Sequence, residues 1–154
     1  MDSSVLDIFR NVSFWSPFCA WVVAQSVKML CGFCRTRQLD FSYLVSTGGM
    51  PSAHSAMAGG LVTSVGLNLG FATPFFATTL AFALVVMFDA STVRRAAGLQ
   101  ARLLNEIVEE LFKEHHFSER KLVDLLGHTR LEVFLGLMIG ILVALIVNAV
   151  AVLF

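Results

Sequence analysis

Four long apolar stretches limit what this chain can fold into. They cover about residues 12–32, 52–69, 73–90 and 131–153, and a helix needs roughly 20 apolar residues to span a bilayer. Of the 154 residues, 56% are hydrophobic and only 14% are charged, which leaves too little polar surface for a soluble domain of this size. The sequence therefore predicts an all-α integral membrane helix bundle with about four spanning helices.

A helix of another kind is expected between the third and fourth stretches. From Val93 to Lys113, apolar residues recur on one helical face and charged residues occupy the other. This pattern predicts an amphipathic surface helix that rests on the membrane or on the bundle. The sequence contains no internal repeat or second domain, so residues 1–154 are expected to form a single membrane domain.

Small residues indicate where the helices pack most closely. The second stretch contains Gly59, Gly60 and Gly66, and the fourth contains Gly136 and Gly140 in a GxxxG pattern. Residues without large side chains let two helix backbones approach each other in a membrane. Both stretches are therefore expected to have a face that packs tightly against another helix.

The charges predict how the chain is oriented in the membrane. If the four stretches cross in alternate directions, all eleven lysines and arginines except Arg10 lie on one side. The positive-inside rule makes that side cytoplasmic and places both termini outside, as in an integral protein of a bacterial-type inner membrane. No basic stripe with interleaved aromatic residues is present, so a nucleic-acid surface is not expected.

The same threading brings the polar residues at the membrane edge to one end of the bundle. Ionisable side chains at membrane depth are costly and are by default a sign of function. The residues that converge are Lys28, Arg35, Ser52, His54, Asp89, Arg94, Arg95, His128 and Glu132. Their convergence on the cytoplasmic face predicts a site there.

These residue types suit phosphate chemistry. Several cations together with helix N-termini can hold an anion that carries more than one charge. Because His128 and Glu132 are four residues apart, the carboxylate can bind one ring nitrogen and leave the other available to attack phosphorus. His54 can protonate the leaving oxygen. No cluster of Asp, His or Cys has metal-ligand spacing, so neither a metal nor a cofactor is expected.

Simpler explanations stay open for each residue taken singly. Thr129 and Glu132 fit the capping box T-x-x-E, in which the glutamate only closes the start of a helix. Asp89 can cap the amphipathic helix, and His54 can bond a carbonyl across a helix interface. The cations at the end of the first stretch can extend along the helix toward water.

Three short blocks carry a family resemblance. The segments KMLCGFCR, PSAH and GHTRLE, in that order, resemble the signature blocks of the type 2 phosphatidic acid phosphatase superfamily, whose relatives include the vanadium haloperoxidases. The longer segments STGGMPSAHSA, DASTVRRAAGLQA and LLGHTRLEVFLG are closer to its divergent bacterial and plant branch, described as acid phosphatase or haloperoxidase related. The resemblance covers about residues 15–148.

The resemblance implies a metal-independent phosphatase that acts on a lipid phosphate or isoprenyl diphosphate through a phosphohistidine. It implies that His128 is the nucleophile, His54 the general acid and Glu132 the residue that orients the nucleophile. The implied phosphate-binding residues are Lys28, Arg35 and Ser52, with Asp89 and Arg94 or Arg95 beside them. The chain departs from the superfamily pattern in having no proline after Arg35, Leu122 in place of the third-block arginine, and a bundle shorter than the usual six helices.

Two other classes of function fit the same composition. One is a non-catalytic membrane protein that binds anionic lipid headgroups in the basic pocket. The other is a small transporter or channel subunit, for which Asp89 is the only sign. The expected partners are the lipid phosphate substrate and membrane lipids, and homo-oligomer formation is left open. Turnover separates the first rival from a phosphatase, because binding requires the cations but not His128.

Overall fold

The computed structural model describes residues 5–37, 49–111 and 127–153. In these ranges the chain forms helices joined by short connections, and it contains no strand. The elements are the 3₁₀-helix η1 (Val5–Arg10) and the α-helices α1 (Val12–Thr36), α2 (Ala53–Leu69), α3 (Pro74–Ser91), α4 (Val93–Leu111) and α5 (Arg130–Leu153). The all-α expectation is confirmed, and each of the four apolar stretches corresponds to one helix.

Local sequence sets where these helices begin. The Asn11 side chain accepts a hydrogen bond from the Ser13 N–H at 2.9 Å and caps α1. Between α2 and α3 the chain turns at Gly70, which has a φ of +94°, a region that favours glycine. Thr73 then caps α3, and Pro74 occupies the first helical position, where its missing N–H has no cost.

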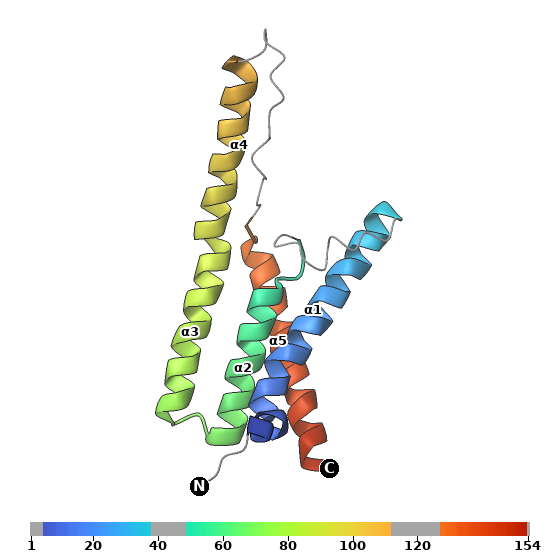
Figure 1. Ribbon diagram of the computed structural model, residues 1–154, viewed down its shortest axis with the longest axis vertical. Coiled ribbons are helices and arrows are strands. Elements are labelled where there is room, and N and C mark those ends of the chain that lie inside the picture. Colours follow the sequence, from blue (N-terminus) through green and yellow to red (C-terminus); the bar gives the residue numbers. More distant parts are fainter. Residues whose placement is uncertain (1–4, 38–48, 112–126, 154) are drawn as a thin grey trace.

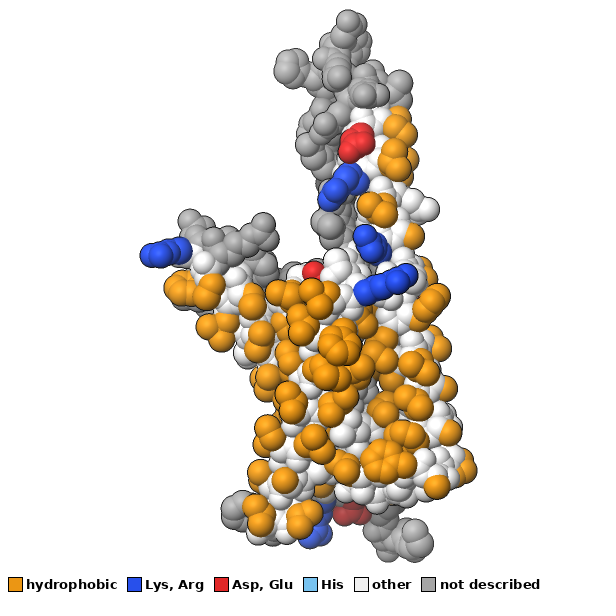
Figure 2. Space-filling model, turned by 180° about the vertical axis from the view of Figure 1, so that it is seen from behind, with side chains coloured by type: hydrophobic (Ala, Val, Ile, Leu, Met, Phe, Trp, Pro, Cys, Tyr) orange, Lys and Arg blue, Asp and Glu red, His pale blue; other side chains and the backbone are white. Residues whose placement is uncertain are grey.

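The helices form a bundle with α2 at its centre. Helix α2 packs against α1, α3 and α5 (Figure 1). Three helical segments are long and apolar enough to cross a membrane, Val12–Cys34, Pro74–Val108 and Arg130–Leu153, whereas α2 has 17 residues. Hydrophobic side chains cover the sides of the bundle, and most lysines and arginines on the visible face lie toward its α4 end (Figure 2). The structure is that of an integral membrane helix bundle.

The glycines of α5 allow the closest contact in the bundle. A Cβ atom at Gly136 would overlap the carbonyl oxygen of Ser52, and one at Gly140 would overlap that of Ala56. On the other side of α2, a Cβ at Gly60 would lie 3.0 Å from the Cβ of Ala20 in α1. The predicted close packing is confirmed, and it places the start of α2 against the first turns of α5.

A polar network that the sequence analysis did not identify joins α1, α2 and α5. The Asn148 amide donates hydrogen bonds to Ser16 Oγ at 3.3 Å, Ser64 Oγ at 3.2 Å and the Ala144 carbonyl at 2.7 Å. Its Oδ1 accepts a hydrogen bond from Asn68 Nδ2 at 2.6 Å. Hydrogen bonds between side chains help hold membrane helices together. This network fixes the three helices at the end of the bundle away from the candidate site.

Replacing Asn148 with leucine is expected to lower the stability of the bundle in detergent by about 1–3 kcal/mol, because Ser16 and Ser64 lose a buried partner. Thermal unfolding followed by circular dichroism measures the change. The control is Thr78→Val, which removes a hydroxyl bonded only to the carbonyl of Pro74 in its own helix. Equal losses in the two variants would show that the network has no stabilising role.

Helix α4 is the helix expected between the third and fourth apolar stretches. It continues the line of α3 beyond the bundle (Figure 1), and α3 is the only described helix that it contacts. The hydrogen bonds pass through the junction, since the Thr92 N–H donates to the Phe88 carbonyl and the Ala96 N–H donates to the Thr92 carbonyl. The junction residue is Thr92 and not a glycine or proline, which could redirect the chain, so α4 keeps the direction of α3. The expected helix is present, and of its two expected placements, on the membrane or on the bundle, the described helices show no packing on the bundle beyond the contact with α3.

Candidate active site

Two backbone hydrogen bonds hold three helix ends together at the candidate site. The Ser52 N–H donates to the Glu132 carbonyl at 3.0 Å, which joins the start of α2 to the first turn of α5. The His128 N–H donates to the Ala90 carbonyl at 3.1 Å, which joins the segment before α5 to the end of α3. The convergence of the second, third and fourth apolar stretches at one end is therefore present in the structure.

His128 is buried and oriented. The residue is only 1% exposed. Its Nδ1 atom lies 3.1 Å from Glu132 Oε2. An ionised carboxylate only accepts hydrogen bonds, so in this pair Nδ1 carries the proton of the neutral ring. Nε2 is then the ring nitrogen with the lone pair.

Glu132 also closes the capping box. Its Oε2 accepts a hydrogen bond from the Thr129 N–H at 3.0 Å, and its own N–H donates to Thr129 Oγ1 at 3.3 Å. The sequence allowed either a helix cap or a partner of His128. The structure places one carboxylate oxygen in both positions, so the two alternatives do not exclude each other.

His54 faces the same space from α2. It is the second residue of that helix, its side chain is exposed, and its ring centroid lies 6.4 Å from that of His128. The two rings are inclined by 59° and are not stacked. The structure thus brings the two predicted histidines close together.

Lys28 reaches the site from within α1. The residue is 3% exposed, and its Cγ and Cδ atoms lie 3.7 and 3.8 Å from the place that a Cβ on Gly49 would occupy. The Glu132 carboxylate attracts its ammonium group electrostatically. Burial of a lysine requires such compensation. Lys28 therefore lies beside Gly49, which belongs to the segment that precedes α2.

Ser52 is fully buried and caps α2. Its hydroxyl oxygen accepts hydrogen bonds from the Ser55 N–H at 3.4 Å and from Ser55 Oγ at 3.0 Å. Because a hydroxyl has one proton of its own, Ser52 retains a hydrogen that it can donate to a ligand. The predicted donor thus also serves as a structural cap.

Further predicted site residues are Arg35, Arg94 and Asp89. Arg35 lies near the end of α1, where that helix diverges from α2 and α5 (Figure 1). The side chains of Arg35 and Arg94 lie outside the described part of the structure. Asp89 is half-buried beside Ala90, the residue whose carbonyl binds the His128 backbone. The roles predicted for the Arg35 and Arg94 side chains therefore stay predictions, and Leu122 lies outside the described residues.

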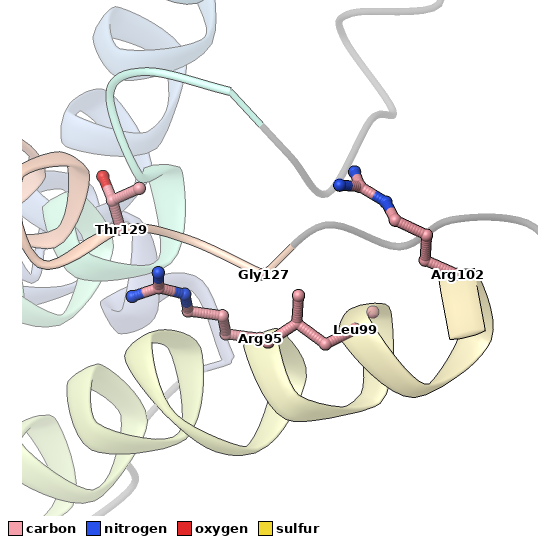
Figure 3. Close-up of a pocket in the computed structure, with 6 residues that line it drawn as sticks. Arg95, Leu99, Arg102, Gly127 and Thr129 are labelled. Carbon is pink, nitrogen blue, oxygen red and sulfur yellow. The ribbon is translucent and has the colours of Figure 1, made fainter.

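A pocket of about 230 Å³ adjoins the segment that contains His128. Figure 3 shows it between α4 and the start of α5. It is lined by Arg95, Gly98, Leu99, Arg102, Gly127 and Thr129. Of these residues, the sequence pattern pointed to Arg95 but not to Leu99 or Arg102. Their spacing in α4, four and seven residues after Arg95, could have shown that they share one helical face.

Comparison with known proteins identifies the family. The model of the Divergent PAP2 family matches residues 9–143. The chain belongs to this family. Its relative YuiD from Bacillus subtilis (strain 168), named an uncharacterized membrane protein, is 38% identical over 152 residues, which cover 92% of this chain and 96% of YuiD. No solved structure matches the chain.

Membership of the Divergent PAP2 family confirms the resemblance found in the three sequence blocks. The matched range contains Lys28, Ser52, His54, His128 and Glu132. The protein is therefore a membrane protein of a phosphatase-related family, and the residues that the resemblance singled out lie in the part of the chain that carries it.

Proposed function

We propose that this protein is a metal-independent membrane phosphatase that hydrolyses a lipid phosphate or isoprenyl diphosphate. The observation that carries the proposal is the environment of His128. Its Nδ1 is 3.1 Å from the Glu132 carboxylate, and its ring centroid is 6.4 Å from that of His54. A buried, oriented imidazole beside a second imidazole supplies the parts of a nucleophile and a general acid.

The proposed reaction has two steps. His128 Nε2 attacks phosphorus, so that a P–N bond forms while the P–O bond to the leaving group breaks, and His54 gives a proton to the departing oxygen. Glu132 stabilises the positive charge that develops on the His128 ring. Water then gives a proton to His54 and attacks the phosphohistidine, which releases phosphate and restores His128.

Electrostatic holding of the phosphoryl group would supply most of the catalysis. Lys28 and Ser52 approach the proposed reaction centre from α1 and from the start of α2. Arg95 and Thr129 line the same pocket. We propose that Arg95 fills the role of the arginine missing from the third sequence block.

The test is phosphate release by purified protein from a panel of lipid monophosphates and isoprenyl diphosphates, with EDTA present throughout. Release in EDTA, together with an acid-labile phosphoenzyme, supports the proposal. Activity lost in EDTA and restored by a divalent ion would overturn the metal-independent mechanism. Specific binding of anionic lipids without turnover would favour the headgroup-binding alternative.

We also propose that the site faces the cytoplasm, because the positive-inside rule places the basic end there. In a variant without Cys19, Cys31 and Cys34, an impermeant thiol reagent on sealed cells is expected to label Leu153→Cys. It should label Glu106→Cys only after the cells are permeabilised. Labelling in the opposite pattern would place the site outside and show that the cations do not report topology.

A further inference from the structure

The pocket beside α4 has a cation toward each end. Arg95 and Arg102 are seven residues apart in the same helix, which separates their backbones by about 10 Å along the helix axis. Both side chains leave α4 on the side of the segment 127–129, and Gly127 lies between them (Figure 3). Because Gly127 has no side chain, it does not fill the space between the two arginines.

The chemistry of this pocket favours an anion. Its six described lining residues include two arginines and no carboxylate. A guanidinium presents a planar set of donors that matches phosphate oxygens in pairs. Leu99 adds an apolar wall between the two charged residues. The lining therefore suits a phosphate group on a partly apolar molecule.

The position of the pocket relates it to the proposed reaction centre. Two of its lining residues, Gly127 and Thr129, directly precede and follow His128. Lys28 approaches from α1, whereas Arg95 and Arg102 come from α4, and these helices lie on opposite sides of the start of α5 (Figure 1). Positive charge thus reaches the start of α5 from two separate helices, α1 and α4.

We infer that the pocket is a second anion site, which binds a second phosphate group covalently linked to the one that His128 attacks. The preferred substrate class is then a diphosphate on an apolar chain, not a monophosphate. Arg102, at the end of the pocket farther along α4, is a specificity-determining residue for this class. This inference rests on the proposed phosphatase function and deepens it.

The test compares farnesyl diphosphate with farnesyl monophosphate. The wild type is expected to have the higher kcat/KM for the diphosphate. In Arg102→Gln, the ratio of the two kcat/KM values should fall about tenfold, the effect of one lost charge-assisted hydrogen bond. The matched control is Arg130→Gln, which removes an equal charge from an exposed position in the first turn of α5 that does not line the pocket.

An unchanged ratio in Arg102→Gln would overturn the inference, as would an equal fall in Arg130→Gln, since that indicates a general effect of charge. A further measurement uses vesicles containing phosphatidic acid. If Arg102→Gln loses binding to these vesicles while its substrate ratio is unchanged, the pocket holds a separate lipid headgroup and the inference is wrong.

Binding of non-hydrolysable analogues separates this inference from the proposed function. The Kd of a farnesyl phosphonate divided by the Kd of a farnesyl methylenediphosphonate gives the relative affinity for the diphosphonate. This ratio of affinities reports on the pocket without any turnover. If the wild type hydrolyses no substrate but Arg102→Gln lowers this ratio of affinities, the second anion site stands and the proposed phosphatase does not. If the wild type hydrolyses substrate but Arg102→Gln leaves the ratio of affinities unchanged, only the second anion site is overturned.

Discussion

Replacing His128 with asparagine is expected to lower kcat by at least about a thousandfold, because the proposed nucleophile is lost. The change should leave the fold intact. Asparagine keeps the backbone N–H that binds the Ala90 carbonyl, and its side-chain amide can donate a hydrogen bond toward Glu132. Phosphate release under saturating substrate measures the loss, and unfolding in detergent checks the fold.

The matched variant is His54→Asn, which removes the proposed general acid and spares the nucleophile. We expect a smaller loss, about a hundredfold, at the lower end of the usual effect of a general acid. Phosphoenzyme formation should be largely restored with p-nitrophenyl phosphate, whose leaving group needs no proton. His128→Asn should form no phosphoenzyme with either kind of substrate. If His128→Asn keeps normal turnover, phosphohistidine chemistry at this residue is excluded.

The parts of the structure that could be predicted depend on local signals. Continuous apolar runs predicted the four bundle helices, and T-x-x-E predicted the capping box that Thr129 and Glu132 form. Threading direction alone predicted that the start of α2 and the start of α5 meet, since antiparallel neighbours in a bundle share their ends. The structure joins these two helix starts by the hydrogen bond from the Ser52 N–H to the Glu132 carbonyl.

The parts that could not be predicted depend on how far the helices are shifted along one another and on the direction in which α4 leaves α3. Asn148, Ser16 and Ser64 meet only because three helices pack at particular relative heights, which sequence periodicity does not specify. The direction of α4 depends on whether helical hydrogen bonds continue through Thr92. The pocket of Arg95 and Arg102 depends on that direction as well, so the sequence indicated Arg95 but neither Arg102 nor the pocket that both residues line.

The second large effect is expected at Glu132. Glu132→Gln should lower kcat by about two orders of magnitude or more. The single oxygen Oε2 binds both His128 Nδ1 and the Thr129 N–H, and the amide oxygen of glutamine can accept both of these hydrogen bonds. The substitution thus keeps the helix cap and the orientation of His128 but removes the negative charge that would stabilise its imidazolium.

The kinetic signature separates this role from a structural one. Glu132→Gln leaves the proposed phosphate-binding residues Lys28 and Ser52 in place. KM is therefore expected to change little while kcat decreases. A variant that had only lost its fold would show less active protein with an unchanged kcat per active site.

Asn11→Ala provides the control for a lost helix cap, because it removes the cap of α1 at the opposite end of the bundle. It should lower the free energy of unfolding by about 1 kcal/mol, the usual scale for a cap, and keep normal kcat and KM. Glu132→Gln should unfold with a cost no greater than that. If Glu132→Gln instead keeps a near-normal kcat, its charge takes no part in the reaction, Glu132 is a cap alone, and the assignment of His128 as nucleophile loses the carboxylate on which it depends.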